Sequence, residues 1–117
     1  MAARLSPREQ ERHRHVPAVD RDRARIVTVP VWLPGISATT LGRIVVVRRD
    51  RVSDRRLLAH ELVHVRQWRE LGAVRFVWAY LGEYAALRRS GLGHHDAYLG
   101  ISFEVEARAL AVAGGSE

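Results

Sequence analysis

One segment constrains the fold of this chain more than any other: LLAHELVHVRQW, residues 57–68. It lies between two helix signals, because Ser53 is suited to cap a first turn and Gly72 to end a last one. Apolar side chains occupy most sides of the predicted helix, so several neighbouring elements must cover it. Two histidines and a glutamate stand inside the apolar run. Burying such groups is unfavourable unless they are paired or bind a metal.

The polar residues of this segment form the pattern H-E-x-x-H, with His60, Glu61 and His64. Residues i and i+4 of a helix lie on the same face, so both imidazoles can bind one metal ion. Glu61 lies beside the first histidine, and its carboxylate can reach a water molecule on that ion. These are two zinc ligands and a general base. The pattern therefore predicts a zinc centre, and a buried pair of core histidines is the alternative.

A catalytic zinc ion usually takes a third protein ligand and keeps one position open for water. The longer pattern H-E-x-x-H-x-x-G-x-x-H is absent, because Gln67 replaces its glycine, and this argues against the metzincin group of zinc peptidases. The third ligand is expected among the acidic residues and histidines that follow the helix. These candidates are Glu83, His94, His95, Asp96, Glu104 and Glu106.

The remaining segments predict an α+β fold in which helices predominate. RIVTVPVWL contains an expected strand over 26–32 that is either an edge strand or a broken one, because Pro30 cannot donate to a central ladder. A second strand is expected within 36–48, with Gly42 as a bulge or a close backbone approach. The elements expected after the H-E-x-x-H helix are a helix over 73–90, a loop over 91–100 and a helix from about 102–103 to 113.

Composition limits the possible classes of protein. The chain of 117 residues has no cysteine, which excludes disulfides and cysteine-based metal sites. The N-terminal sequence MAARLSPREQERHRH has no apolar region of the signal-peptide type, and no apolar run has the length of a membrane span. We therefore expect one globular domain in the cytoplasm, with no membrane span.

The charge of the chain is concentrated near its start. All nineteen basic residues are arginine, and the formal net charge is +6. Residues 1–25 carry seven arginines against four acids, which is half of the excess. We predict a basic, weakly ordered arm over 1–25, a domain over 26–113 and a tail over 114–117. Within the arm, SPREQERHRH is suited to a short helix with Ser6 as cap and Pro7 in the first position. A basic arm can contact nucleic acid or an acidic protein, but a solvated arm is the simpler interpretation, and a nucleic-acid partner is not expected.

Two motifs together resemble a known family. HELVHVRQW followed by FEVEARAL is similar to the gluzincin group of zinc peptidases, especially the minigluzincins and related small bacterial domains of unassigned function. In that group a second helix supplies a glutamate ligand in a pattern resembling E-x-x-A-[DN]. EVEAR fits with Glu104 as the ligand and Ala107 three residues on, whereas Arg108 departs from the final acidic or amide position. Glu106 is the alternative ligand, or the residue that supports the histidines.

The resemblance implies a zincin-like, minigluzincin-like single domain with zinc held by His60, His64 and Glu104. It implies a metallopeptidase in which Glu61 is the general base, and in which a strand at the rim of the cleft pairs with an extended peptide or protein substrate. A phenol often stabilises the oxyanion in such enzymes, and Tyr98 is the candidate here because it is close to the glutamate helix. Tyr80 and Tyr84 are expected in the core. His94 and His95 are an alternative ligand or an aid to the oxyanion, although exposed histidines on a loop are the simpler interpretation.

A second class of function remains open. The chain is alternatively a metal-binding, non-catalytic module whose basic arm contacts nucleic acid or an acidic protein. The two hypotheses differ at Glu61, because a binding module needs no general base. The sequence does not identify the substrate, the cleavage specificity or the oligomeric state.

Overall fold

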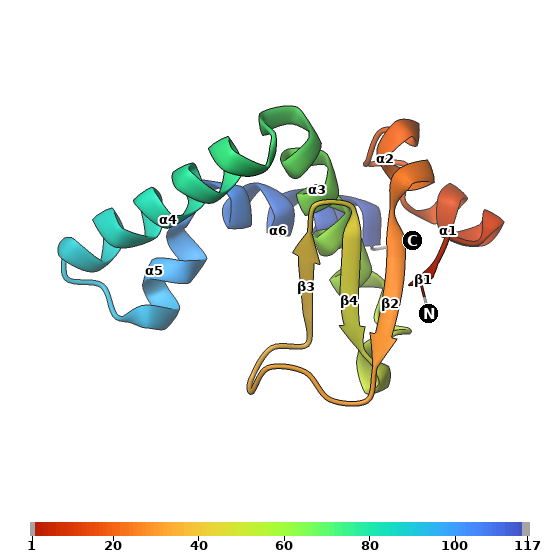
Figure 1. Ribbon diagram of the computed structural model, residues 1–117, viewed down its shortest axis with the longest axis horizontal. Helices are drawn as coiled ribbons and strands as arrows, with labels where there is room; N and C mark the ends of the chain where they lie inside the picture. The colour runs from red at the N-terminus through yellow and green to blue at the C-terminus, as the bar shows by residue number, and fades with distance from the viewer. Residues whose placement is uncertain (1, 116–117) are drawn as a thin grey trace.

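The computed structural model describes residues 2–115, with side chains for residues 2–112, so residues 116–117 of the predicted tail lie outside the described part (Figure 1). The α+β class is confirmed. Within the described residues no helix is both long enough and apolar enough to cross a membrane. The elements in chain order are β1 (Ala2–Ala3), α1 (Pro7–Arg12), α2 (Ala18–Arg23), β2 (Arg25–Val29), β3 (Ala38–Leu41), β4 (Ile44–Arg48), the 3-10 turn η1 (Arg49–Arg51), α3 (Arg55–Leu71), α4 (Ala73–Arg89), α5 (His94–Gly100) and α6 (Ser102–Gly115).

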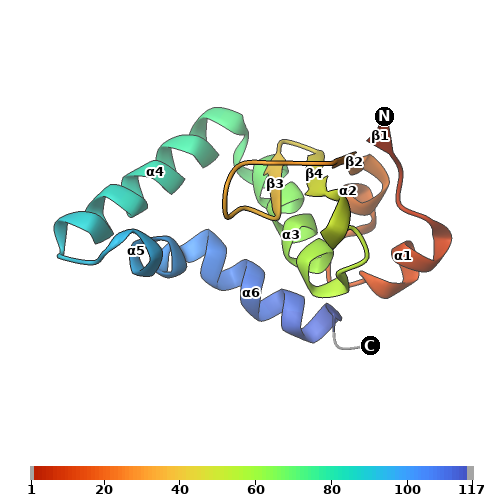
Figure 2. The same cartoon turned by 90° about the horizontal axis from the view of Figure 1, so that it is seen from below.

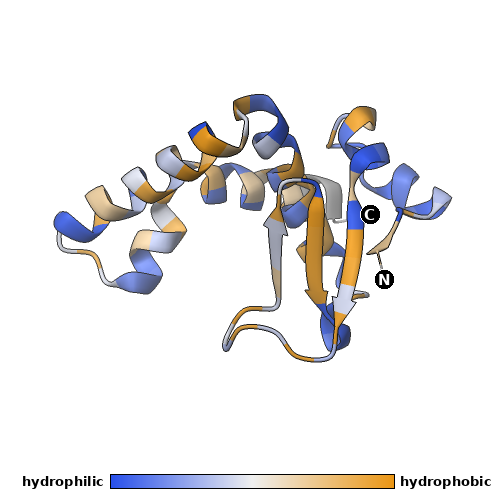
Figure 3. Cartoon of the chain, viewed as in Figure 1, coloured by the Kyte–Doolittle hydropathy of each residue, from blue (hydrophilic) through white to orange (hydrophobic). Residues whose placement is uncertain are grey.

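The four strands form one sheet in the order β1-β2-β4-β3. The central strands β2 and β4 are parallel, and the outer strands β1 and β3 are antiparallel to their neighbours. β4 is the most hydrophobic strand, and three consecutive valines, Val45, Val46 and Val47, are buried in it (Figure 3). The expectation of an edge strand over 26–32 is wrong, because β2 pairs with β1 on one side and with β4 on the other. The alternative of a broken strand is confirmed, because β2 ends one residue before Pro30, whose missing N–H cannot continue the ladder.

The prediction of a single strand within 36–48 is wrong in the number of strands, because the segment forms two strands joined as a hairpin. β3 and β4 are joined by Gly42 and Arg43, and Gly42 has a φ of +66° whereas Arg43 does not have a positive φ. A two-residue hairpin turn with a left-handed glycine in its first position matches the twist of antiparallel strands. The turn leaves β3 at the end of the sheet, where it lies next to α3.

The helix that carries H-E-x-x-H is the middle layer of the fold. Figure 2 shows α3 between the sheet on one side and α6 on the other. Its N-cap is Asp54 instead of the predicted Ser53, because the Asp54 carboxylate accepts the N–H of Leu57 at 3.0 Å. Gly72, with a φ of +81°, ends the helix as predicted. The core cluster around α3 consists of Leu5, Val16, Ala24, Ile26, Val45, Val47, Leu58, Leu62, Val63, Val65 and Ala107.

The N-terminal segment differs from the weakly ordered arm that its charge predicts. Residues 2–23 form β1, α1 and α2, and they lie beside β2 and α3 (Figure 1). Ser6 and Glu9 form a reciprocal capping box at the start of α1. The buried carboxylate of Asp20 accepts two hydrogen bonds from Arg69 of α3, at 2.6 and 2.9 Å. Several of the acids and arginines of this segment are therefore used in local and tertiary pairs, and its charge alone is a poor guide to its structure.

The helices α4 and α5 extend away from the sheet and form a second projecting part of the molecule, the α4–α5 arm (Figure 1). The predicted loop over 91–100 is wrong, because residues 94–100 form α5. Glycines on both sides of this segment suggested a loop, but Ala97 is fully buried and anchors a short helix between α4 and α6. Among the described side chains of α4, only Phe76 is buried. The arm is thus attached to the body through one end of α4 and through α5.

Candidate metal centre

The two histidines of α3 lie on the same face, as their spacing predicts. The Nε2 atoms of His60 and His64 are 3.2 Å apart, and the ring centroids are 4.9 Å apart. His64 is buried and His60 is partly buried. Both imidazoles therefore direct the nitrogen that commonly binds metal to one point above the helix.

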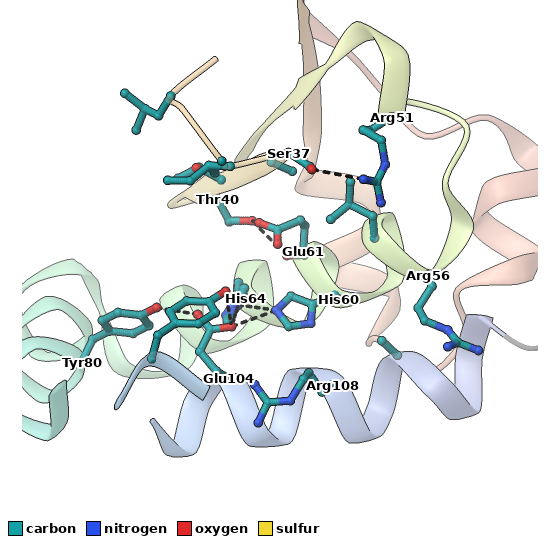
Figure 4. A pocket seen from close by; sticks show the side chains of 18 of the residues that line it. Ser37, Thr40, Arg51, Arg56, His60, Glu61, His64, Tyr80, Glu104 and Arg108 are labelled. Carbon is teal, nitrogen blue, oxygen red and sulfur yellow. Dashed lines mark hydrogen bonds and ion pairs between the residues drawn. The ribbon is translucent and has the colours of Figure 1, made fainter. Parts of the chain in front are cut away.

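The carboxylate of Glu104 comes to this point from α6, 40 residues further along the chain. Its Oε1 atom lies 2.9 Å from Nε2 of His60 and 3.1 Å from Nε2 of His64 (Figure 4). The three donor atoms form a nearly equilateral triangle. A tetrahedral zinc ion with ligand distances of about 2.0–2.1 Å holds its ligand atoms about 3.3 Å apart. The triangle needs to widen by only a few tenths of an ångström to match, so these residues fit the ion that the sequence predicts.

Glu61 is held apart from this triangle by the sheet. Its Oε1 atom accepts a hydrogen bond from the hydroxyl of Thr40 on β3, at 2.9 Å. The donor atoms of His60, Glu61 and His64 all lie within 4.8 Å of one another, so Glu61 borders the same point in space. Burial raises the pKa of Glu61, although the charges of His64 and His60 oppose this shift. A carboxylate with a raised pKa beside a metal position is suited to accept a proton at neutral pH.

Two phenols of the arm complete the surroundings of Glu104. Tyr80 of α4 donates to Oε2 at 2.5 Å, and Tyr98 of α5 donates to Oε1 at 3.2 Å. The structure thus brings Tyr98 to the site, and it also brings Tyr80, which the sequence interpretation assigned to the core. The ring of Tyr80 does pack against Phe76 and Phe103, but its hydroxyl reaches the carboxylate (Figure 4).

Gln67 is a site residue that sequence reasoning missed. Its Oε1 atom accepts the Nδ1–H of His64 at 2.7 Å, and its Nε2 group donates to the carbonyl of Phe103 and to Glu106. A histidine that donates through Nδ1 presents Nε2 to a metal, and such partners also hold the ring in place. The signal available in the sequence was a polar residue three positions after His64 in an apolar run.

The charges at the centre are strongly coupled. Burial alone would raise the pKa of Glu104, but hydrogen bonds from His60, His64 and Tyr80 hold it well below its usual range. Burial alone would lower the pKa of His64, but its hydrogen bond and ion pair with Glu104 raise it. The protein therefore favours a charged carboxylate between the two imidazoles. A metal cation at this point would replace a proton shared between the carboxylate and the imidazoles. The affinity for the metal would therefore depend on pH.

The other candidate residues lie at different distances from this centre. Glu106 pairs with Arg66 and accepts from Gln67, so it touches His64 only through that amide. His94 contacts the hydroxyl of Tyr84 at 2.8 Å, and both His94 and His95 are exposed at the wall of the cleft. Glu83 accepts two hydrogen bonds from Ser102 and thereby ties the start of α6 to α4. Arg108, one turn after Glu104, donates to the carbonyl of Leu99 at the end of α5.

A cleft of about 1010 Å³ opens above the centre. β3 and the segment before it form one wall, α4 and α5 form another, and α3 and α6 form the floor. The lining is largely apolar, with the polar atoms of the triangle and of Glu61 near its middle. A cleft of this size that brings a few polar groups together is the usual form of a ligand-binding site.

Comparison with known proteins gives one match. A family model described as the eCIS core domain matches residues 34–72, about a third of the chain. The matched region begins in the segment before β3 and ends at the glycine that terminates α3, so it contains Thr40, His60, Glu61 and His64 and leaves out Glu104. No curated protein and no solved structure matches the chain. The family match therefore covers the strand and helix that carry the first part of the site.

Proposed function

We propose that this chain is a zinc-dependent hydrolase, a small metallopeptidase with a zincin-like fold. The observation that carries the proposal is the convergence of His60, His64 and Glu104, whose donor atoms lie 2.9–3.2 Å apart beside the separately held carboxylate of Glu61. Two imidazoles and one carboxylate are a common ligand set of catalytic zinc sites, in which the fourth position stays open.

The residues of the chain have separate tasks in this proposal. His60, His64 and Glu104 would hold a zinc ion, and its Lewis acidity would acidify the attacking water and polarise the scissile carbonyl. Glu61 takes a proton from that water as its oxygen adds to the carbonyl carbon. The same carboxyl then gives the proton to the amine nitrogen as the C–N bond breaks. Thr40 keeps Glu61 directed toward the reacting groups.

The two phenols both line the cleft, and we assign them different roles. Tyr98 is 38% exposed and lines the cleft, which suits a group that donates to the carbonyl oxygen as negative charge develops on it. Burial and the nearby charge of Glu104 raise the pKa of Tyr98, so its proton is retained at neutral pH. Tyr80 holds the second oxygen of Glu104 and acts as a positioning residue for that ligand.

The position of β3 in the sheet favours a polypeptide as the substrate. β3 is the last strand in the sheet order, and the cleft is lined by its first three residues, 38–40, and by residues 35–37 before it. An edge strand with unpaired N–H and C=O groups can add an extended peptide as a further strand. Because Thr40 of this strand contacts Glu61, a peptide paired with β3 would pass directly over the centre.

The test measures the zinc content of the purified chain and its cleavage of a peptide library. We expect about one zinc per chain, retention in Glu106→Ala, and loss in Glu104→Ala. Glu61→Gln is expected to keep the zinc and to lose cleavage. If wild type takes up no zinc when zinc is supplied, the hydrolase proposal is wrong. If zinc binds and Glu61→Gln performs like wild type in every assay, a non-catalytic metal-binding module is the better description.

A further inference from the structure

The two ends of the cleft differ in chemistry. The end formed by α4 and the segment before β3 is apolar, and its lining includes Leu33, Trp68, Phe76, Val77 and Leu81. The opposite end lies at the start of α3, where Arg51 and Arg56 line the wall. Figure 4 shows Tyr80 and Arg56 on opposite sides of His60, so the metal centre lies between the apolar end and the basic end.

The two arginines at the basic end are not equivalent. Arg51 donates to Asp54 at 2.6 Å and to Ser37 at 3.3 Å, so its guanidinium is already occupied. Arg56 is exposed, and within the described residues it forms no hydrogen bond or ion pair. Arg56 therefore presents a guanidinium that is available to a group entering the cleft.

The position of Arg56 is not explained by the stability of its helix. It is the second residue of α3, and no acidic residue lies in the first turn. A cation near the N-terminus of a helix is unfavourable, because the helix dipole is positive there. The carboxylate at the helix start, that of the N-cap Asp54, is paired with Arg51 and with the N–H of Leu57. No ion pair to Arg56 is present among the described residues.

The separation between Arg56 and the metal centre sets the length of the recognised segment. Arg56 precedes His60 by four residues, so the two lie on the same face with their Cβ atoms about 5–6 Å apart. The Arg56 side chain extends away from His60, so its guanidinium lies farther from the metal centre than its Cβ does (Figure 4). An extended peptide advances about 3.3 Å per residue, so a side chain about two to four residues away from the scissile bond would reach the guanidinium.

We propose that Arg56 is a specificity-determining residue that selects polypeptides with an acidic side chain about two to four residues from the scissile bond, and with a large apolar residue on the other side of that bond. This inference rests on the proposed hydrolase function. The net charge of +6 acts in the same direction, because a positive field concentrates acidic chains near the surface.

The experiment compares cleavage of a random-sequence peptide library by the zinc-loaded wild type, Arg56→Glu and Arg55→Glu, with cleavage sites read by mass spectrometry. Arg55→Glu is the matched control, because Arg55 is the adjacent residue of α3, undergoes the same charge change and does not line this cleft. Arg56→Gln is the second variant, and circular dichroism establishes that each protein is folded. Zinc content is measured in parallel and is expected to be equal in all of them.

We expect aspartate and glutamate to be enriched about threefold to fivefold on one side of the bond in wild type, the range for a partly exposed ion pair. Arg56→Glu should replace this preference with one for lysine and arginine, Arg56→Gln should abolish it, and Arg55→Glu should keep it. The inference is overturned if wild type cleaves without acidic preference, or if Arg56→Glu retains that preference; the hydrolase proposal survives either result.

A wild type that cleaves nothing would instead remove the hydrolase proposal. The same library is then captured on immobilised wild type and Arg56→Glu. Enrichment of acidic peptides by wild type, reversed in Arg56→Glu, supports Arg56 as a determinant of binding. Capture without that reversal overturns the inference.

Discussion

The body of the domain and its α4–α5 arm each contain one long helix, and the two helices have equal length but different packing. α3 and α4 have seventeen residues each, yet α3 buries eight of them and α4 buries only Phe76. The ligands of the proposed metal centre, His60, His64 and Glu104, belong to the body, whereas Tyr80 and Tyr98 belong to the arm. The metal position is therefore held by packed helices, and the groups that surround it come from a less constrained part. This arrangement suits a site whose ligands must be rigid and whose cleft must admit a chain.

The largest difference between body and arm is expected in stability. Leu62 of α3 is fully buried, so Leu62→Ala should lower the free energy of unfolding by about 2–5 kcal/mol. Leu81 of α4 is 55% exposed, so Leu81→Ala should change it by no more than about 0.5 kcal/mol. Urea unfolding of the metal-free proteins measures both. Equal losses in the two variants would show that the arm is packed as firmly as the body.

A second effect is a dependence of the free energy of unfolding on pH, and it arises from a residue of the body. His13 is fully buried, and neither of its ring nitrogens has a hydrogen-bond partner among the described residues. Burial, with added repulsion from His15 and Arg12, lowers the pKa of His13 from 6.5 to about 4. Between these values the unfolded chain binds a proton that the folded chain does not.

Stability from neutral His13 is therefore fully present above pH 6.5 and is lost as the pH falls toward 4. The loss amounts to at most about 3 kcal/mol. His13→Phe has no such proton to bind, so its stability should fall less over this interval than that of wild type. Unfolding of metal-free wild type and His13→Phe at several pH values gives the difference directly. Parallel curves for the two proteins would contradict the assignment.

The third effect concerns the ligand support supplied by the body. Gln67→Ala removes the acceptor that orients His64, and should weaken zinc binding about 10–100-fold. Competition with a chromophoric chelator measures the affinity. Glu70→Gln is a suitable control on the same helix, because Glu70 is exposed and forms an ion pair with Arg66. An unchanged affinity in Gln67→Ala would mean that packing alone fixes the ring.

The smallest effect is expected from the arm. Tyr80→Phe removes one hydrogen bond to Glu104 but leaves the ring packed on Phe76, so zinc affinity should fall about threefold to tenfold. The same competition assay measures it. A loss as large as that of Gln67→Ala would show that the arm positions the ligand as firmly as the body does.

Local sequence signals predicted the elements whose determinants lie within a few residues. The end of α3 at Gly72 and the break of β2 before Pro30 follow from backbone conformations that glycine and proline impose. The hairpin at Gly42 and the helix α5 were missed, because a glycine in a strand pattern is equally compatible with a bulge, and Ala97 looks unremarkable until its neighbours bury it. The short helix α1 was also predicted, because its cap Ser6 and its first residue Pro7 are local signals. The attachment of the N-terminal segment to the body was missed, because its carboxylate at Asp20 finds its partner, Arg69, 49 residues away.

For the candidate site, the sequence by itself determined the group of His60, Glu61 and His64, because helical periodicity places them together wherever the helix packs. Only the tertiary structure decided which glutamate joins them. Glu104 and Glu106 are two residues apart on one helix, so they point in different directions, and the docking of α6 on α3 turns Glu104 inward and leaves Glu106 to pair with Arg66. Contacts between distant segments likewise recruited Gln67 and Tyr80, since their roles depend on partners that lie 24 to 39 residues away.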